Sequence, residues 1–152
     1  MRNLQAPGRS PVIAPNGMAS TSHSLATEAA VAMLSSGGNA MDAALTACAV
    51  QAVIEPGSTG IGGDCFCLYA PAGSTNTVAF NGSGRAPLKN NLSWFQEQGI
   101  TKITQTMPHA VTIPGAVDAW FQLNRDHGQK SLADILQPAI NYARDGYPVG
   151  QR

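Results

Sequence analysis

The chain has 152 residues, with nine basic and nine acidic side chains and therefore no formal net charge. Because no lysine or arginine cluster is present, the composition argues against binding to nucleic acid or to an anionic membrane surface. Charged residues make up only 12% of the chain, against about 25% in an average protein. Either another part of a larger protein covers some of this surface, or uncharged polar side chains supply it.

The length fits a single domain, which we expect over residues 1–152. No apolar run approaches the roughly 20 residues that a membrane span needs. The segment Met1–Pro7 lacks the apolar core of a secretory signal. We therefore expect a cytoplasmic protein that does not enter a membrane.

Two helices are predicted in the first third of the chain, over residues 24–36 and 40–54. Gly37 and Gly38 supply a left-handed C-cap for the first helix. Asn39 then serves as the N-cap of the second helix, with Asp42 three residues later in a capping-box arrangement. The second helix is apolar nearly all round, so we expect it to be buried.

A glycine-rich segment, residues 55–64, joins this helix to the next predicted element. It contains four glycines and one proline. Such a segment is typical of positive φ angles or of a close approach by another group. A phosphate-binding loop needs a strand before it and a helix after it, and the order here is reversed. We therefore predict tight packing rather than nucleotide binding at residues 55–64.

Two strands near residues 65–70 and 77–82 are predicted to form a hairpin. Cys65 and Cys67 are expected on opposite faces of the first strand. The Cys-x-Cys pair and the three scattered histidines match no usual zinc spacing, so we expect free thiols and no metal site.

A second glycine-dense segment, residues 81–87, follows the hairpin and is called the strand exit below. It contains Arg85, whose guanidinium group can donate hydrogen bonds to both oxygens of a carboxylate. The alternative is that Arg85 forms a surface or structural salt bridge.

The second half of the chain contains two further predicted helices, over residues 114–126 and 131–145. Pro114 is expected at the first helical position, with Val117, Trp120 and Phe121 facing inward. The helix over 131–145 is predicted to begin with a second capping box, Ser131 with Asp134.

Weaker patterns predict a short helix over residues 92–98 and a short strand over 111–113. The fold class is therefore α+β.

The neighbouring Thr21, Ser22 and His23 suggest a hydroxyl nucleophile beside its base. Sequence neighbours seldom reach the required geometry, however, and Ser22 and Ser24 are ordinary helix-capping residues. We therefore favour the structural role. His109 has no evident partner, and His127 is placed favourably at a helix C-terminus.

Taken together, six segments of the chain resemble the start of the large subunit of a gamma-glutamyltransferase, also called gamma-glutamyltranspeptidase. They occur in the order of that family and cover nearly the whole chain, which makes the ordered set specific. The segments are Gly17–His23, Gly37–Ala44, Glu55–Gly63, Arg85–Pro87, Val111–Gly115, and Leu136–Ile140 continuing through Asp145–Pro148.

The resemblance implies part of an αββα sandwich of the N-terminal-nucleophile hydrolases, which cut themselves into two subunits. In this family the nucleophile is a threonine that becomes the N-terminus of the small subunit and attacks gamma-glutamyl amides such as glutathione. That region lies outside this chain, so residues 1–152 form an incomplete domain with no catalytic residue. We expect the chain alone to be inactive, to need no cofactor, and to have the small subunit as its partner.

The chain departs from the family at one position that bears on substrate binding. Members active on gamma-glutamyl compounds usually carry an arginine three residues before the Ala-Pro pair, where it holds the substrate α-carboxylate. Here that position is Ser83, and the nearby arginine is Arg85. Either Arg85 replaces the missing arginine, or the substrate is bound differently. The second option implies acylase-type amide hydrolysis on a substrate other than glutathione.

Two non-enzymatic alternatives stay open. The chain is either a truncated, non-catalytic scaffold or a small-ligand binding module that uses its glycine-rich segments.

Overall fold

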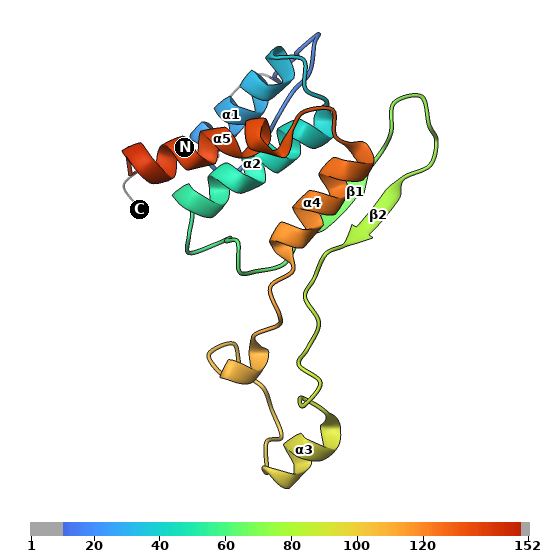
Figure 1. Cartoon of the computed structure of the whole chain (residues 1–152), viewed down its shortest axis with the longest axis vertical. Helices are drawn as coiled ribbons and strands as arrows, with labels where there is room; N and C mark the ends of the chain where they lie inside the picture. The colour runs from blue at the N-terminus through green and yellow to red at the C-terminus, as the bar shows by residue number, and fades with distance from the viewer. Residues whose placement is uncertain (1–10, 150–152) are drawn as a thin grey trace, which may run out of the picture.

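The computed structural model describes residues 11–149, so the expectations for Met1–Pro7 lie outside the described residues. The chain folds into five α-helices, one 3-10 helix and a two-stranded antiparallel sheet within this range (Figure 1). Their bounds are α1 Ser24–Ser35, α2 Ala40–Ile54, β1 Phe66–Tyr69, β2 Val78–Asn81, α3 Leu92–Glu97, η1 Pro108–Ala110, α4 Ala116–His127 and α5 Leu132–Asp145.

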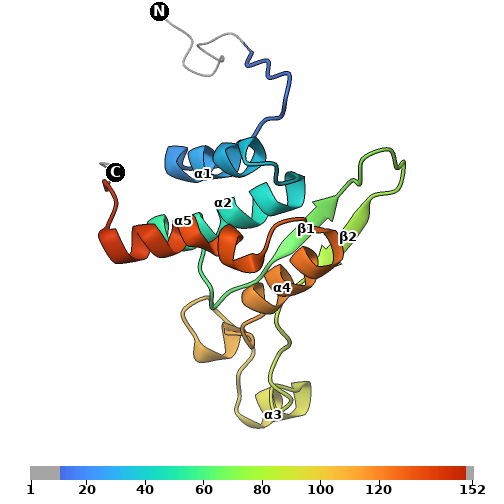
Figure 2. The same cartoon turned by 45° about the horizontal axis from the view of Figure 1, so that its top comes forward.

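Helix α2 is the centre of the core, because it contacts α1, α4 and α5 (Figure 2). Most of its residues are buried, as its apolar sequence predicts. Many of these residues are alanines, and small side chains allow the neighbouring helices to approach closely. None of the helices within residues 11–149 combines the length and the apolar character needed to cross a membrane.

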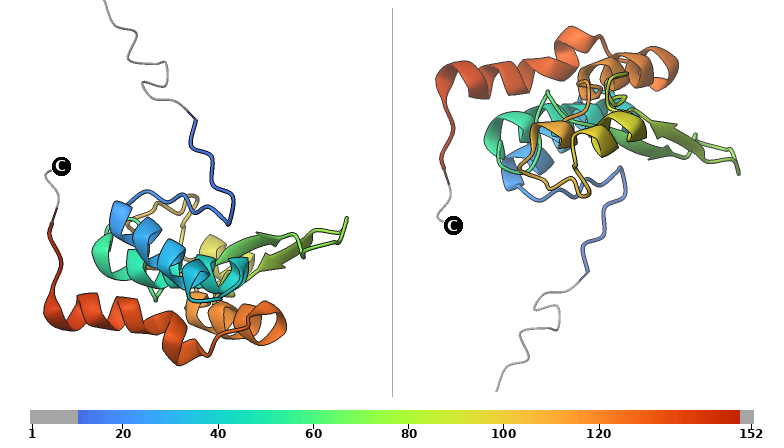
Figure 3. Two further views of the ribbon diagram at one scale, coloured as in Figure 1. Left: turned by 90° about the horizontal axis from the view of Figure 1, so that it is seen from above. Right: turned by 90° about the horizontal axis from the view of Figure 1, so that it is seen from below.

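The hairpin pairs β1 with β2 in antiparallel register, from Phe66 opposite Asn81 to Tyr69 opposite Val78. Its loop extends past the helices to one side (Figure 3). One face of the hairpin packs on the helical core, whereas the opposite face leaves Phe66 and Leu68 exposed at 68% and 79%.

The expectation for Cys65 and Cys67 was wrong. Both side chains are half-buried against the core, because residues two apart in a strand point to the same face.

The predicted helix over 114–126 begins later than expected. Gly115 is the N-cap and Ala116 the first helical residue, so Pro114 precedes the helix instead of opening it. The buried face consists of Ala116, Ala119, Trp120 and Leu123, so the inward placement of Trp120 is confirmed. The inward placement of Val117 and Phe121 was wrong, since they are 39% and 56% exposed.

The other predicted helices agree closely with the structure. Residues 40–54 are helical as predicted, and the helices near 24–36 and 131–145 differ by one residue at one end. Asn39 with Asp42 forms the predicted capping box, and Ser131 accepts from Asp134 N as the predicted N-cap. The strands are shorter than expected, although they lie within the predicted ranges.

Residues 86–113 form an arm that extends away from the helices and carries α3 (Figures 1 and 2). The predicted short helix is therefore confirmed at residues 92–97. Trp94, Phe95 and His109 meet edge to face within the arm, with His109 at 5.3 and 5.6 Å from the other two ring centres. The strand predicted over 111–113 is absent, because within this stretch only Ile113 N pairs with another segment's backbone.

The buried carboxylate of Asp42 joins two turns of the backbone, the one before α2 and the one between α4 and α5. Asp42 is fully buried at the start of α2, and its oxygens accept hydrogen bonds from Asn39 N at 2.9 Å, Gln129 N at 3.0 Å and Lys130 N at 3.3 Å. Asn39 Nδ2 adds a bond of 2.7 Å to the carbonyl of His127. The turn before α2 and the turn between α4 and α5 are thus held together by polar contacts.

We predict that Asp42→Ala lowers the free energy of unfolding by about 3 to 5 kcal/mol, because it removes a fully buried carboxyl group and leaves the N–H groups of Asn39, Gln129 and Lys130 without their acceptor. Urea unfolding followed by circular dichroism measures this loss. The matched control is Asp134→Ala, which removes an exposed carboxylate three residues after the N-cap of α5, where it accepts from the Ser131 hydroxyl, and it should cost about 1 kcal/mol or less. Equal losses in the two variants would contradict the role assigned to Asp42.

Candidate functional site

Three backbone segments converge where the hairpin ends and α4 begins. Gly82 N donates to Cys65 O at 2.7 Å, and Ile113 N donates to Arg85 O at 3.0 Å. Gly63 O accepts from both Gly115 N and Ala116 N, at 3.1 and 2.9 Å. The strand exit is therefore bonded to the start of β1 on one side and to the residues before α4 on the other.

Close backbone approach explains the glycines of the strand exit. A Cβ atom added to Gly84 would lie 1.4 Å from Ile113 O, and one added to Gly115 would lie 2.4 Å from Gly82 O. A Cβ on Gly82 would lie 2.4 Å from the Cβ of Ala119 in α4. Any side chain at these positions forces the segments apart, so glycine is required for the three to meet.

The first glycine-rich segment does not behave as predicted. No atom lies within 4 Å of a Cβ built on Gly60 or Gly62, and none of the positive-φ residues of the described chain falls within residues 55–64. The tight packing expected there occurs instead at the strand exit. The reason is tertiary: the turn at residues 61–62 is exposed and only Gly63 bonds the start of α4, whereas residues 82–84 are enclosed by two other segments.

The two predicted substrate-contact residues lie side by side at the strand exit. Ser83 is half-buried; its N–H donates to Asn81 Oδ1 at 2.9 Å and its hydroxyl to Gly84 O at 3.4 Å. Arg85 is exposed, and its carbonyl is held by Ile113 N. Within residues 11–149 its guanidinium group has no ion pair or hydrogen bond, so the salt bridge considered as an alternative is not formed by the described residues.

Asp64 is a residue of this site that the sequence analysis did not single out. Its Oδ1 accepts from Gly84 N at 3.4 Å and from the Thr112 hydroxyl at 3.3 Å. An aspartate between glycines and a strand is common in ordinary turns, so the single sequence held no signal for this role. The Asp64 side chain therefore contacts both neighbouring segments, the strand exit and the residues before α4.

The hydroxyl and imidazole groups at residues 21–23 form no nucleophile–base pair. His23 Nδ1 accepts the N–H of Leu25 at 3.2 Å, which makes His23 the N-cap of α1 in place of either neighbouring serine. Ser22 donates instead to the carboxylate of Glu55 at 2.5 Å. The structural role favoured from the sequence is therefore right, although the capping residue differs.

Glu55 anchors the segment before α1 to the end of α2. The hydrogen bond from Ser22 and, with a smaller effect, the one from Gln51 at 3.0 Å hold the pKa of the Glu55 carboxyl below its ordinary value. The Glu55 carboxylate is thus ionised, and its hydrogen bonds are made to Ser22 and Gln51. This argues for a structural role of Glu55 at the start of the segment 55–64.

The three thiols are poor nucleophiles. Burial, with smaller effects from the Cys65 and Cys67 thiols, raises the pKa of Cys48 to about 11. Burial likewise raises the pKa of Cys65 and of Cys67. These groups stay protonated near neutral pH, and a protonated thiol attacks weakly. Within residues 11–149 no group of three His, Cys, Asp or Glu side chains is arranged to hold a metal ion.

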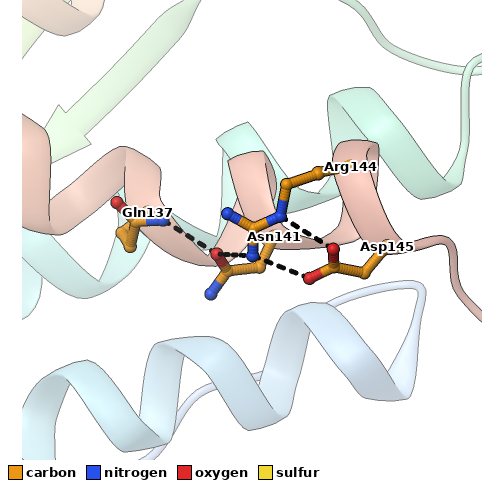
Figure 4. A network of polar contacts seen from close by, with 4 residues as sticks. All are labelled: Gln137, Asn141, Arg144 and Asp145. Atoms are coloured by element: carbon orange, nitrogen blue, oxygen red, sulfur yellow. Dashed lines mark hydrogen bonds and ion pairs between the residues drawn. The ribbon is translucent and has the colours of Figure 1, made fainter.

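Helix α5 carries a separate polar network on its surface, formed by Gln137, Asn141, Arg144 and Asp145 (Figure 4). Arg144 Nε and Asp145 Oδ1 are 2.7 Å apart, and both side chains are largely exposed. Exposed pairs of this kind contribute little to stability because water and salt screen them. The network has the geometry of a solvated helix face and lies outside the strand exit.

The chain is similar, in sequence and in fold, to one family of enzymes. The sequence profile of the family described as gamma-glutamyltranspeptidase matches residues 26–152. The chain is 37% identical over 138 residues to the glutathione hydrolase-like YwrD proenzyme of Bacillus subtilis strain 168, covering 91% of this chain and 26% of that protein.

Two solved structures have the same fold over nearly the whole chain. The gamma-glutamyltranspeptidase of Helicobacter pylori superposes with a TM-score of 0.81 at 33% identity, covering 91% of this chain and 40% of that one. The cephalosporin acylase of Bacillus halodurans superposes with a TM-score of 0.79 at 36% identity, covering 95% and 28%. The α+β fold class expected from the sequence is confirmed.

We predict that Gly84→Ala displaces the strand exit and destabilises the protein by about 2 kcal/mol or more, because the added methyl group meets the backbone of Ile113. Gly60→Ala is the matched control, since nothing lies within 4 Å of its added atom, and it should change stability by no more than about 0.5 kcal/mol. Thermal unfolding of both variants measures the difference. A Gly84→Ala variant as stable as Gly60→Ala would show that the three segments do not meet this closely.

Proposed function

The chain belongs to the gamma-glutamyltranspeptidase family, and we propose that it is the N-terminal segment of an enzyme that cleaves gamma-glutamyl amides such as glutathione. The chain spans about a quarter of the length of the curated relative described above. The proposed nucleophile is an N-terminal threonine that lies outside residues 1–152. By itself, this chain should be inactive.

The observation that carries the proposal is the construction of the strand exit. Arg85 is held at its backbone by Ile113, while its guanidinium group stays exposed and unpaired within the described residues. An unpaired guanidinium group on an anchored backbone favours binding of a carboxylate, because both oxygens can be bonded without first breaking an ion pair. A gamma-glutamyl group supplies such a carboxylate.

The chemistry proposed for the whole protein is acyl transfer through a covalent intermediate. The threonine hydroxyl attacks the amide carbon, its own α-amine takes the hydroxyl proton and passes it to the amide nitrogen, and the C–N bond then breaks to release that nitrogen as an amine. Water or an acceptor amine then releases the acyl group. In this scheme the residues of the present chain bind and orient the substrate, with Arg85 holding the carboxylate and Ser83 beside it.

A second candidate function is acylase-type hydrolysis of an amide other than glutathione. Ser83 occupies the position at which the family pattern implies an arginine. The loss of a charge-assisted contact costs about 1.5 to 3 kcal/mol of binding, which is enough to change the preferred substrate. The similarity to a cephalosporin acylase, at 36% identity, supports this candidate.

A non-catalytic scaffold and a small-ligand binding module are the remaining candidates. For the binding module, titration calorimetry of the chain with glutamate and with glutathione gives measurable heat. The enzyme and scaffold proposals give none for this chain alone.

The test of the proposed function uses the protein extended to the length of its relatives. We predict that mass spectrometry shows two fragments, the smaller beginning with threonine, and that the matured protein hydrolyses glutathione. Release of a non-glutamyl acyl group without glutathione turnover would favour the acylase candidate. A single uncut chain with no turnover of either substrate would contradict both enzyme proposals.

A second prediction separates the two ways of binding substrate. In the matured protein, Arg85→Ala should raise the KM for gamma-glutamyl donors about tenfold or more, because a charged contact to the substrate is lost. Self-cleavage should change less, since this contact is made with substrate. Arg125→Ala, which removes an exposed guanidinium group on α4, is the matched control and should leave KM unchanged.

Ser83→Arg tests the same site by gain of function. If the usual carboxylate site has been lost, this variant should increase glutathione turnover above that of the unchanged protein. An unaltered KM for every gamma-glutamyl donor in Arg85→Ala would exclude the binding role of Arg85.

A further inference from the structure

We propose that Asp64 is a positioning residue: its carboxylate holds the strand exit in place so that Ser83 and Arg85 are presented to substrate. The inference rests on the proposed function for its effect on substrate binding. The contacts that it invokes belong to the fold itself and can be measured without substrate.

The carboxylate of Asp64 extends the hairpin ladder past its last backbone bond. The regular pairing of β1 with β2 ends at Phe66 and Asn81. The next bond runs from Gly82 N to Cys65 O at 2.7 Å. One step further, Gly84 N donates to Asp64 Oδ1 instead of to a backbone carbonyl. A side-chain acceptor thus keeps residues 82–84 beside the start of β1 after the strands have ended.

The same oxygen ties a third segment to the strand exit. Asp64 Oδ1 also accepts from the hydroxyl of Thr112, at 3.3 Å. Ile113, the next residue, bonds Arg85 O and lies where a Cβ on Gly84 would be. Gly84 is therefore held between Asp64 on one side and Ile113 on the other. Removing the Asp64 carboxylate would therefore release one of these two restraints on Gly84.

The hydrogen bonds of the Asp64 side chain run to a backbone N–H and to a hydroxyl group, and not to the guanidinium group of Arg85. Within residues 11–149 Asp64 forms no ion pair with Arg85. A carboxylate that paired with Arg85 would compete with a substrate carboxylate for the same donors. By accepting an N–H and a hydroxyl, Asp64 orients the segment and leaves the guanidinium group available.

The experiment compares Asp64→Ala, Asp64→Asn and Asp118→Ala in the full-length, matured protein. Hydrogen–deuterium exchange of peptides that contain Gly84 reports the position of the strand exit, and steady-state kinetics with a gamma-glutamyl donor separate KM from kcat. Asp118 is an exposed carboxylate on α4 that is bonded to Gln122 and serves as the matched control. Circular dichroism confirms that each variant is folded.

We expect Asp64→Ala to speed exchange at Gly84 and to raise KM, each by about tenfold, because the acceptor of the Gly84 N–H and of the Thr112 hydroxyl is lost. The kcat should change by no more than about twofold, since Asp64 does not take part in bond making. Asp64→Asn should stay close to the unchanged protein in both measurements, because the amide oxygen can accept the same two bonds. Asp118→Ala should change neither measurement.

Unchanged exchange at Gly84 in Asp64→Ala would overturn the inference, as would faster exchange with an unchanged KM. An Asp64→Asn variant that behaves like Asp64→Ala would overturn the acceptor role of Asp64. If the unchanged protein turns over no gamma-glutamyl donor, the proposed function fails separately. Exchange at Gly84 then still decides whether Asp64 positions the strand exit.

Discussion

The buried carboxylate of Asp42 is the interaction on which the arrangement of the helices depends. It lies at the first turn of α2 and satisfies N–H groups from its own cap and from the turn before α5. A buried polar group is stable only with such partners, so the Asp42 side chain requires the two turns to lie together. Because α2 also contacts α1, α4 and α5, this interaction fixes the turn between α4 and α5 against the helix at the centre of the core.

The helical layer in turn brings the strand exit to its position. The N-terminus of α4 is bonded through Gly115 and Ala116 to Gly63, and the hairpin packs on the same core through Tyr69 and Phe80. The strand exit passes between these two elements. Only residues without a side chain fit where the backbones meet, which explains the glycines at positions 82, 84 and 115.

This construction suits a chain that binds substrate but does not supply the nucleophile. The described hydroxyl and imidazole groups near α1 are used as caps and anchors, and the thiols have raised pKa values. At the strand exit, the exposed Arg85 has its backbone carbonyl bonded to Ile113, next to Gly84, which Asp64 and Ile113 hold from two sides. The chain belongs to the gamma-glutamyltranspeptidase family, and under the function proposed above the departure at Ser83 makes carboxylate binding at the strand exit the property to test.

The sequence by itself determined the helices, the N-caps of α2 and α5 and the hairpin, because these depend on neighbours a few residues apart, whereas the N-caps of α1 and α4 differ from the prediction. Asn39 with Asp42 is such a case, and the motif order was enough to identify the family. Only the tertiary structure decided which glycines are enclosed, that Asp42 reaches residues 129 and 130, and that Asp64 contacts Gly84 and Thr112. Those contacts join residues 20 to 88 positions apart, and no local pattern encodes such a distance.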